Sequence, residues 1–270
     1  MTTRIFIDGY GSIGKRHYTV LNEIYNKPRF EINDPNLGIN SRPSGRYDIG
    51  VICTPTHMHI ESALKLSESC DILFIEKPLH TSLQTIVDSK SIIATKNIHV
   101  GCNIRYTDAI SRLREVSKSA SILQVTAMSN LLKWRDDREK KAYSFHKSMG
   151  GGVLMDFIHE PDYIYSIFGL PNDVNLFQMR LRDDVTVDSD DSCIMNWKYD
   201  RLLVSFILSY CSNDYIRKVN VLMHDGSSEE IIFTSDDINS SYERQWRSLI
   251  QNGPQNTYDD CVSLYSMLLT

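Results

Sequence analysis

One stretch near the start of the chain decides the fold: Arg4-Ile-Phe-Ile-Asp-Gly-Tyr-Gly-Ser-Ile-Gly-Lys-Arg-His17. The run Ile5–Ile7 is apolar and short, as expected of a strand buried in a parallel sheet. Three glycines follow in the G-x-G-x-x-G spacing of dinucleotide-binding turns, namely Gly9, Gly11 and Gly14. The first permits a tight turn, the second lets the backbone approach a pyrophosphate, and the third lets the next helix pack closely. The stretch therefore predicts a nucleotide site at the start of a Rossmann-type domain.

An acidic residue supports this interpretation. Asp34 lies twenty residues beyond Gly14, after the next strand, where a carboxylate would accept hydrogen bonds from an adenosine ribose. The helix after the glycine turn would direct its N–H groups and positive dipole end at the phosphates. The alternative is an ordinary strand–helix turn. The residues expected to contact the cofactor here are Gly9, Tyr10, Gly11, Ser12, Ile13, Gly14 and Asp34.

The pattern along the chain predicts two α/β domains. Strand and helix patterns alternate through the first hundred residues, which indicates a parallel sheet with right-handed crossovers. After about residue 103, strand-like runs follow one another with few helices between them, which favours an open, mainly antiparallel sheet. We expect a Rossmann dinucleotide-binding domain over 1–103 and a substrate and oligomerisation domain over 104–270. A terminal helix at about 258–269 could pack back on the first domain.

Composition excludes several classes of function. The chain has 270 residues, 41% of them hydrophobic and 23% charged, with a net charge of −5 and no long basic run. We therefore expect neither nucleic acid nor a membrane as partner. A strand pattern begins almost at once, so we expect no signal peptide and a cytoplasmic protein. The six cysteines are scattered, and His57 and His59 lack further ligands at zinc spacing, so no metal site is expected.

Polar residues that follow the strands of the first domain are candidates for chemistry, because ligands of open α/β sheets bind beyond the carboxyl ends of the strands. Besides the glycine turn and Asp34, these residues are Thr54, Pro55, Glu76, Lys77 and Asn103. Lys77 directly follows an apolar strand, and its ammonium could polarise a hydroxyl or carbonyl oxygen or exchange a proton with it. The alternative is a surface lysine before a proline turn.

Four motifs in order resemble the glucose–fructose oxidoreductase/inositol dehydrogenase/MocA (Gfo/Idh/MocA) family. They are Gly9-Tyr-Gly-Ser-Ile-Gly-Lys-Arg-His17, Thr54-Pro-Thr-His-Met-His59, Glu76-Lys-Pro78 and Val100-Gly-Cys-Asn-Ile-Arg105. The resemblance implies a Rossmann domain followed by an α/β domain whose sheet forms one wall of the active site. It implies that Lys77 works beside the nicotinamide and that His59 belongs to the cofactor site. It also implies a homodimer or homotetramer assembled through the outer face of the second sheet.

A fifth motif is similar to the family's second-domain signature: Gly150-Gly-Gly-Val-Leu-Met-Asp-Phe-Ile-His-Glu-Pro-Asp-Tyr163. The resemblance implies that His159 faces the substrate as proton donor or acceptor, with Asp156 as a further catalytic residue. A histidine that caps a helix or fills the core is the alternative. Asp156 lies three residues before His159, whereas the family spacing is four. Pro161 disfavours an uninterrupted helix, so we expect a kink or a restart near His159.

The polar stretch 132–144 resembles one branch of the family, which is often associated with surface polysaccharides and nine-carbon acidic sugars. Trp134 offers a flat apolar face for a sugar ring, and Arg135 or Arg138 could hold a carboxylate or phosphate. A solvated charged loop is the alternative. The substrate-binding residues expected are Arg105, Trp134, Arg135 and His159.

We therefore expect an NAD(P)-dependent oxidoreductase that transfers hydride between nicotinamide and a secondary alcohol or ketone of a sugar or sugar nucleotide. NAD is favoured because Asp34 would repel the 2′-phosphate of NADP, although Arg42 and Arg46 in the following loop could reverse this. Two alternatives stay open. One is a non-catalytic sensor with the same fold, and the other is an enzyme that keeps NAD bound and uses transient oxidation for epimerisation or elimination.

Overall fold

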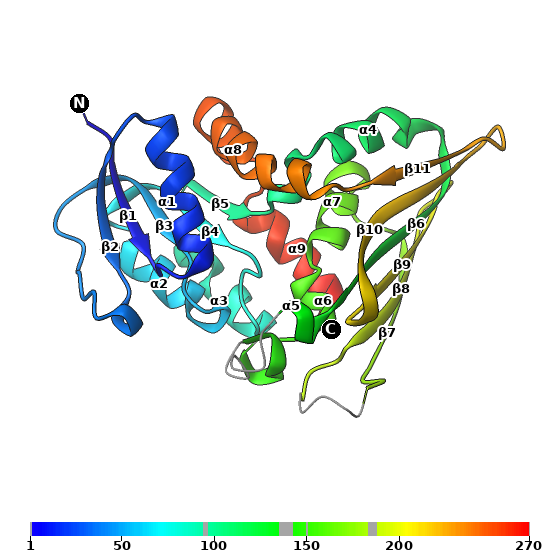
Figure 1. The fold of residues 1–270 in the computed structure, drawn as a ribbon, viewed down its shortest axis with the longest axis horizontal. Helices are drawn as coiled ribbons and strands as arrows, with labels where there is room; N and C mark the ends of the chain where they lie inside the picture. The colour runs from blue at the N-terminus through cyan, green and yellow to red at the C-terminus, as the bar shows by residue number, and fades with distance from the viewer. Residues whose placement is uncertain (1, 94–96, 135–142, 150, 183–187, 270) are drawn as a thin grey trace. The chain divides into compact units, whose positions relative to one another are not determined.

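The computed structural model describes residues 2–93, 97–134, 143–149, 151–182 and 188–269 (Figure 1). These residues form two compact units. The first unit runs to Asn103 and also contains Tyr242–Leu269, and the second unit is Ile104–Ser241. The boundary near residue 103 coincides with the change in sequence pattern, but the second unit ends well before the expected 270.

The first unit is built on a parallel five-stranded sheet with the order β2-β1-β3-β4-β5. The strands are β1 (Arg4–Asp8), β2 (Arg29–Asn33), β3 (Tyr47–Ile52), β4 (Cys70–Glu76) and β5 (Asn97–Gly101). Its helices are α1 (Ser12–Ile24), α2 (His59–Leu66), α3 (Leu83–Ile93), α9 (Tyr258–Leu268) and the second half of α8 (Ser235–Asn252). Strands joined by helical crossovers give the Rossmann-type architecture that the alternating pattern predicts.

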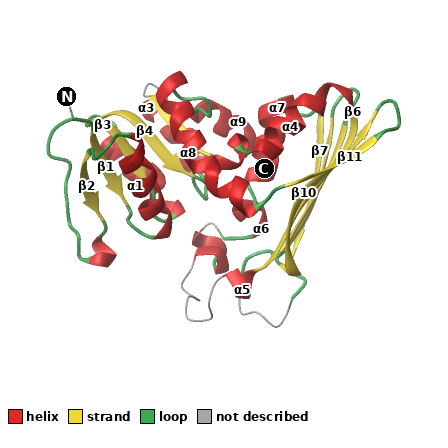
Figure 2. Ribbon diagram, turned by 45° about the horizontal axis from the view of Figure 1, so that its top comes forward, coloured by secondary structure: helices red, strands yellow, loops and turns green. Residues whose placement is uncertain are grey.

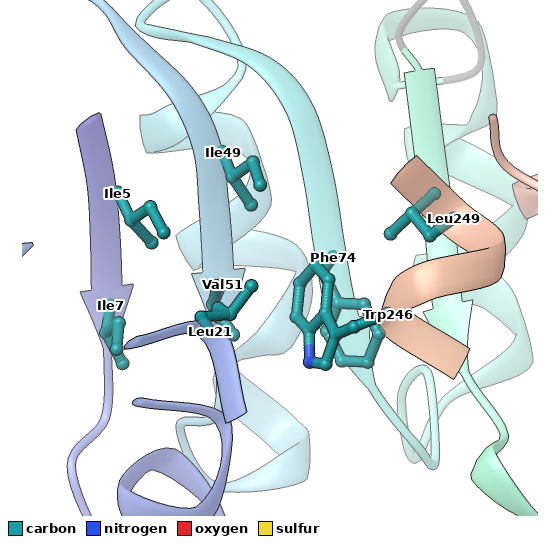
Figure 3. Close-up of a cluster of buried hydrophobic side chains, with 8 residues drawn as sticks. All are labelled: Ile5, Ile7, Leu21, Ile49, Val51, Phe74, Trp246 and Leu249. Atoms are coloured by element: carbon teal, nitrogen blue, oxygen red, sulfur yellow. The ribbon is translucent and has the colours of Figure 1, made fainter. Parts of the chain in front are cut away.

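The core of this unit explains why the end of the chain belongs to it. Side chains from β1, α1, β3, β4 and α8 form one buried cluster (Figure 3). Within it, Trp246 of α8 stacks on Phe74 of β4 with ring centroids 4.5 Å apart, and Trp246 is fully buried. On α9, the Tyr258 hydroxyl donates to the Ile86 carbonyl of α3 at 2.8 Å. The sequence suggested such packing only for 258–269, because the aromatic partner of Trp246 lies far away in the chain.

The second unit contains a six-stranded sheet with the order β11-β10-β6-β9-β8-β7. Only the β6–β9 pair is parallel among the described strand pairs, so the expected mainly antiparallel sheet is confirmed. The strands are β6 (Ala120–Asn130), β7 (Asp173–Met179), β8 (Ser192–Lys198), β9 (Leu203–Ser209), β10 (Cys211–Met223) and β11 (Ser228–Ile232). The helices are α4 (Asp108–Val116), α5 (Leu131–Trp134), α6 (Val153–Asp156) and α7 (His159–Phe168).

Helices cover one face of this sheet, and Figure 2 shows α4, α6 and α7 on the same side of it. Strand alternation follows from this arrangement: in β8, Met195 and Trp197 are buried, whereas Ile194 between Cys193 and Met195 is 50% exposed. The helical run around the fifth motif is interrupted, since α6 ends at Asp156 and α7 begins at His159. Pro161 lies in the first turn of α7, where its missing N–H costs no hydrogen bond, so the expected restart near His159 is observed.

Candidate nucleotide and catalytic site

The three glycines of the turn between β1 and α1 have two different roles. A Cβ on Gly9, whose φ is +93°, would lie 2.5 Å from the Cys53 carbonyl carbon. A Cβ on Gly14 would lie 2.1 Å from the Gly9 carbonyl oxygen. Both positions are therefore closed to larger residues by the protein's own backbone. A Cβ on Gly11, in contrast, would meet no described heavy atom within 4 Å.

This opening lies at the amino end of α1. Gly11 is the N-cap of the helix, with no side-chain hydrogen bond to the first turn and no acidic residue in that turn among the described residues. The first-turn N–H groups and the helix dipole therefore favour an anion at this point. A dinucleotide pyrophosphate fits this arrangement, because it needs backbone donors and the close approach that the open space at Gly11 permits.

Asp34 contacts the backbone of the glycine turn. It is 8% exposed, and its Oδ2 accepts a hydrogen bond from the Tyr10 backbone N–H at 2.7 Å. Its Oδ1 accepts from the Asn36 N–H at 3.1 Å, which caps the short 3-10 helix Pro35–Leu37. The carboxylate thus fastens the glycine turn to the end of β2. Each oxygen has a further lone pair, so the ribose contact stays a prediction beside this structural role.

The Glu76-Lys77-Pro78 turn follows β4 at the same edge of the sheet as the glycine turn, because β1, β3 and β4 are parallel neighbours. Lys77 is half-buried, and its peptide bond to Pro78 is cis. The Glu76 carboxylate accepts hydrogen bonds from the Lys77 backbone N–H at 3.1 Å and from the buried ring of His17, Nε2 to Oε1, at 2.8 Å. Beyond Pro78, the Leu79 N–H donates to the Tyr265 hydroxyl at 2.8 Å.

Thr54 and Pro55 follow β3 at this edge, and Asn103 follows β5 as the first residue of the 3-10 helix Asn103–Tyr106. The structure thus brings the predicted cofactor residues of the first unit, apart from His59, to one edge of one sheet. Burial, with the Glu76 and Asp8 charges, raises the pKa of the neighbouring Cys53 thiol, which disfavours its thiolate form.

His59 occupies a different place from the one expected of a cofactor contact. Its side chain is buried between the two turns, with Nδ1 2.8 Å from the Pro78 carbonyl oxygen and Nε2 2.7 Å from the Thr54 carbonyl oxygen. Burial lowers the pKa of His59, against the opposing effects of these carbonyls and the Glu76 carboxylate. Both ring nitrogens face the protein's own backbone, so the ring supports the two turns instead of pointing at a ligand.

In the second unit, the two predicted catalytic residues lie at adjoining helix ends. Asp156 is the last residue of α6, is 2% exposed, and accepts a hydrogen bond from the Tyr210 hydroxyl. His159 is the first residue of α7 and is 7% exposed. Asp156 therefore has a structural partner between β9 and β10, which the shifted Asp–His spacing did not reveal.

Two buried ion pairs fix α7. Arg105 donates to Asp162 from Nε at 2.6 Å and from a terminal nitrogen at 2.7 Å, and Arg217 on β10 donates from Nε to Glu160 at 2.7 Å. All four side chains are buried. Removing one partner of such a pair costs roughly 3–5 kcal/mol. Arg105, which was expected to bind substrate, thus donates two hydrogen bonds to the Asp162 carboxylate of its own unit.

The remaining candidates are outside what the structure describes. Trp134 ends α5, but its side chain is not among the described ones, and Arg135 and Arg138 lie outside the described residues. Among the residues that are described, no group of three or more His, Cys, Asp or Glu side chains could hold a metal ion. The described helices also include none long and apolar enough to cross a membrane.

Comparison with known proteins identifies the fold. The chain matches no family model. A stretch of 135 residues is 24% identical to the 2,7-anhydro-N-acetylneuraminate hydratase of Escherichia coli (strain K12), covering 48% of this chain and 36% of that protein. The whole fold is similar to solved structures of dehydrogenases.

The WlbA dehydrogenase from Bordetella pertussis, in complex with NADH and UDP-GlcNAcA, has a TM-score of 0.81 at 15% identity, over 99% of this chain and 94% of that one. GenD2 from gentamicin A biosynthesis, in complex with NAD, has a TM-score of 0.78 at 16% identity, over 99% and 92%. The myo-inositol 2-dehydrogenase from Lactobacillus plantarum has a TM-score of 0.75 at 14% identity, over 98% and 94%. The chain has the two-domain fold of the Gfo/Idh/MocA-type dehydrogenases, which confirms the fold that the motif resemblance implied.

Proposed function

We propose that this protein is an NAD-dependent oxidoreductase that transfers hydride between nicotinamide and a secondary alcohol or ketone of a sugar or sugar nucleotide. The observation that carries the proposal is the carboxyl edge of the first sheet. There an open, uncapped helix start at Gly11 suits a pyrophosphate, and Lys77 follows β4 at the same edge. The NAD or NADH bound in two similar structures supports the same cofactor.

Different residues of the first unit would bind the cofactor and transfer the proton. Gly9–Gly14 would bind the pyrophosphate, Asp34 the ribose, and Thr54, Pro55 and Asn103 the remaining cofactor. NAD, when bound, accepts or supplies the hydride. The Lys77 Nζ would polarise the oxygen of the reacting carbon and exchange a proton with it. His159 would be the second proton donor or acceptor, with Asp156 beside it in the chain, as the sequence resemblance implies.

Two similar proteins support a substrate class. WlbA was crystallised with UDP-GlcNAcA, and the partly matching hydratase is named for an anhydro form of N-acetylneuraminate. Both are acidic sugars or their nucleotides. Together with the Trp134–Arg135 segment, they favour a role in surface-polysaccharide or acidic-sugar biosynthesis, with Arg105, Trp134 and Arg135 as the predicted substrate contacts.

The hydratase also favours a second candidate. Water addition or elimination on a sugar becomes easier after a neighbouring hydroxyl is oxidised, because the ketone acidifies the adjacent C–H. An enzyme of this kind would keep NAD bound and return the hydride within each cycle. The matched stretch covers only 36% of the hydratase, so the simple dehydrogenase remains the main proposal. A sensor that binds NAD without turnover is the remaining alternative.

The test combines cofactor titration with a substrate screen. Calorimetric titration of the purified protein is expected to show NADH binding at least about tenfold tighter than NADPH, because Asp34 repels a 2′-phosphate. Nucleotide sugars and sialic-acid-like sugars are then screened for change in nicotinamide absorbance, with a catalysed change expected for at least one. Tighter NADPH binding would refute the role of Asp34. NAD that co-purifies and is reduced without exchange would favour the second candidate, and binding without any turnover would favour the sensor.

We also propose that the protein is a homodimer or homotetramer assembled through the outer face of the second sheet. Phe177 and Ile194 are direct cross-strand neighbours on this face, 66% and 50% exposed, and Ile207 is the next neighbour in β9. With the half-buried Ile207, they form an apolar row across three strands, which is typical of an interaction surface.

Light scattering on the wild-type protein is expected to give two or four times the chain mass of 31.0 kDa. The double variant Phe177→Glu/Ile194→Glu is expected to be monomeric, because charge on this face cannot be buried. As a control, Leu37→Glu changes an equally exposed apolar residue of the first unit and should leave the mass unchanged. A monomeric wild-type protein would refute this assembly.

A further inference from the structure

A buried histidine outside the predicted site residues contacts the Glu76-Lys77-Pro78 turn. His17 lies on α1, three residues past Gly14, and its side chain is fully buried. The Trp246 indole Nε1 lies 2.9 Å from His17 Nδ1. An indole N–H can only donate, so Nδ1 must accept, and in the neutral ring the proton is on Nε2. Trp246 therefore fixes the tautomer of His17.

The fixed tautomer gives the contact with Glu76 a direction. The His17 Nε2–H donates to Glu76 Oε1 at 2.8 Å, and the other carboxylate oxygen accepts from the Lys77 N–H at 3.1 Å. Glu76 is only 9% exposed, so its charge depends on these donors in place of water. One chain of hydrogen bonds thus runs from the indole through the imidazole and the carboxylate to the backbone of Lys77.

We infer that His17 is a positioning residue for Lys77, acting through Glu76. The inference rests on the proposed function in one respect, the role of Lys77 in proton transfer. The direction in which the Lys77 side chain leaves the sheet is set by its backbone. Glu76 accepts a hydrogen bond from that backbone N–H, and His17 donates to the same carboxylate. A displacement of about 1 Å at a reacting group can lower turnover by about a hundredfold.

The rest of the turn has independent supports, so loss of the His17 contact should loosen Lys77 without unfolding the segment. The Pro78 carbonyl contacts the ring of His59, and the Leu79 N–H donates to Tyr265. Both contacts are made by residues that follow Lys77 in the chain, whereas Glu76 precedes it. The effect of His17 is therefore expected in the backbone of Lys77 itself.

Two near-isosteric variants separate the contacts of His17. In His17→Gln the amide nitrogen lies near the position of Nε2 and can still donate to Glu76. In His17→Asn the shorter side chain reaches only the position of Nδ1, so it can accept from Trp246 but loses Glu76. A matched control is His99→Asn, since His99 is equally buried and also packs on Phe74, while its ring nitrogens contact Gln245 and the Gln255 N–H.

The first readout needs no substrate: the hydrogen-exchange rate of the Lys77 amide, measured by NMR. We expect faster exchange in His17→Asn, and exchange near the wild-type rate in His17→Gln and His99→Asn. The second readout is kinetic. His17→Asn is expected to lower kcat by about 10- to 100-fold with an unchanged Kd for NADH, whereas His17→Gln should retain most of kcat.

Equal Lys77 exchange in the Asn and Gln variants would overturn the inference, as would equal losses of kcat. Trp246→Phe provides a further variant, because it keeps the ring on Phe74 but removes the donor that fixes the tautomer. It should change Lys77 exchange in the same direction as His17→Asn, and no change would also count against the inference. If the wild-type protein bound no NADH, the proposed function would fail, while the exchange rates would still decide the role of His17.

Discussion

Replacing Lys77 with alanine is expected to lower kcat by two to four orders of magnitude while leaving the Kd for NADH within about twofold of wild type. The reason is the place of the residue in the first unit. Its backbone is held by the Glu76 carboxylate on one side, and the Leu79 N–H on the other is bound to Tyr265. Loss of the ammonium would remove a proton-transfer group but none of the backbone donors at the glycine turn.

The measurement pairs steady-state kinetics, on the substrate found by the screen, with calorimetric titration of NADH. Lys65→Ala is a suitable control, since Lys65 lies on α2 and pairs with the exposed Glu61 of the same helix. Lys77→Arg adds a second comparison, because it keeps the charge but cannot give up a proton. Turnover of the alanine variant near the wild-type rate would show that the proton passes through another group.

Alanine at Gly11 and at Gly14 is expected to separate cofactor binding from folding. Gly11→Ala places a methyl group in open space, so we expect an unchanged free energy of unfolding. The same methyl group would occupy the space where a pyrophosphate approaches the backbone, so NADH affinity should fall at least about tenfold. Gly14→Ala would place its Cβ 2.1 Å from the Gly9 carbonyl oxygen. That clash is expected to cost at least about 2 kcal/mol of stability.

Urea unfolding and NADH titration on the two variants provide the comparison. The decisive result is that Gly11→Ala keeps the wild-type stability but binds NADH weakly, whereas Gly14→Ala is destabilised. If Gly11→Ala bound NADH as tightly as the wild type does, the cofactor would not pass over this turn. If Gly11→Ala lost as much free energy of unfolding as Gly14→Ala, a loss of NADH binding in Gly11→Ala could not be assigned to a blocked ligand site.

Local sequence was enough to predict the parts of the site that depend on strand ends. The Gly9–Gly14 turn and Lys77 could be placed at one edge because parallel strands bring their carboxyl ends together, whatever the rest of the fold. The restart of the helix at His159 was likewise predictable from Pro161, since proline acts within its own turn.

Partners brought together by the fold could not be predicted in this way. Arg105 was predicted as a substrate contact, but its ion pair with Asp162, 57 positions away, could not be predicted. Asp156 was predicted as a catalytic residue, but its hydrogen bond from Tyr210 could not be predicted, since Tyr210 lies 54 positions away. His17 was visible only as the end of a glycine motif, because Trp246 lies 229 positions further along the chain. In each case one side chain was evident and its partner was not.

The indole of Trp246 also gives the protein an optical property. It is fully buried, stacks on Phe74 and donates its N–H to His17, which contacts the residue next to Lys77. Indole emission responds to what its N–H faces and to nearby charge. The chain has three tryptophans, Trp134, Trp197 and Trp246. Only Trp246 belongs to the first unit, so in a variant with the other two replaced by phenylalanine its fluorescence would report the state of the Lys77 turn without any added label.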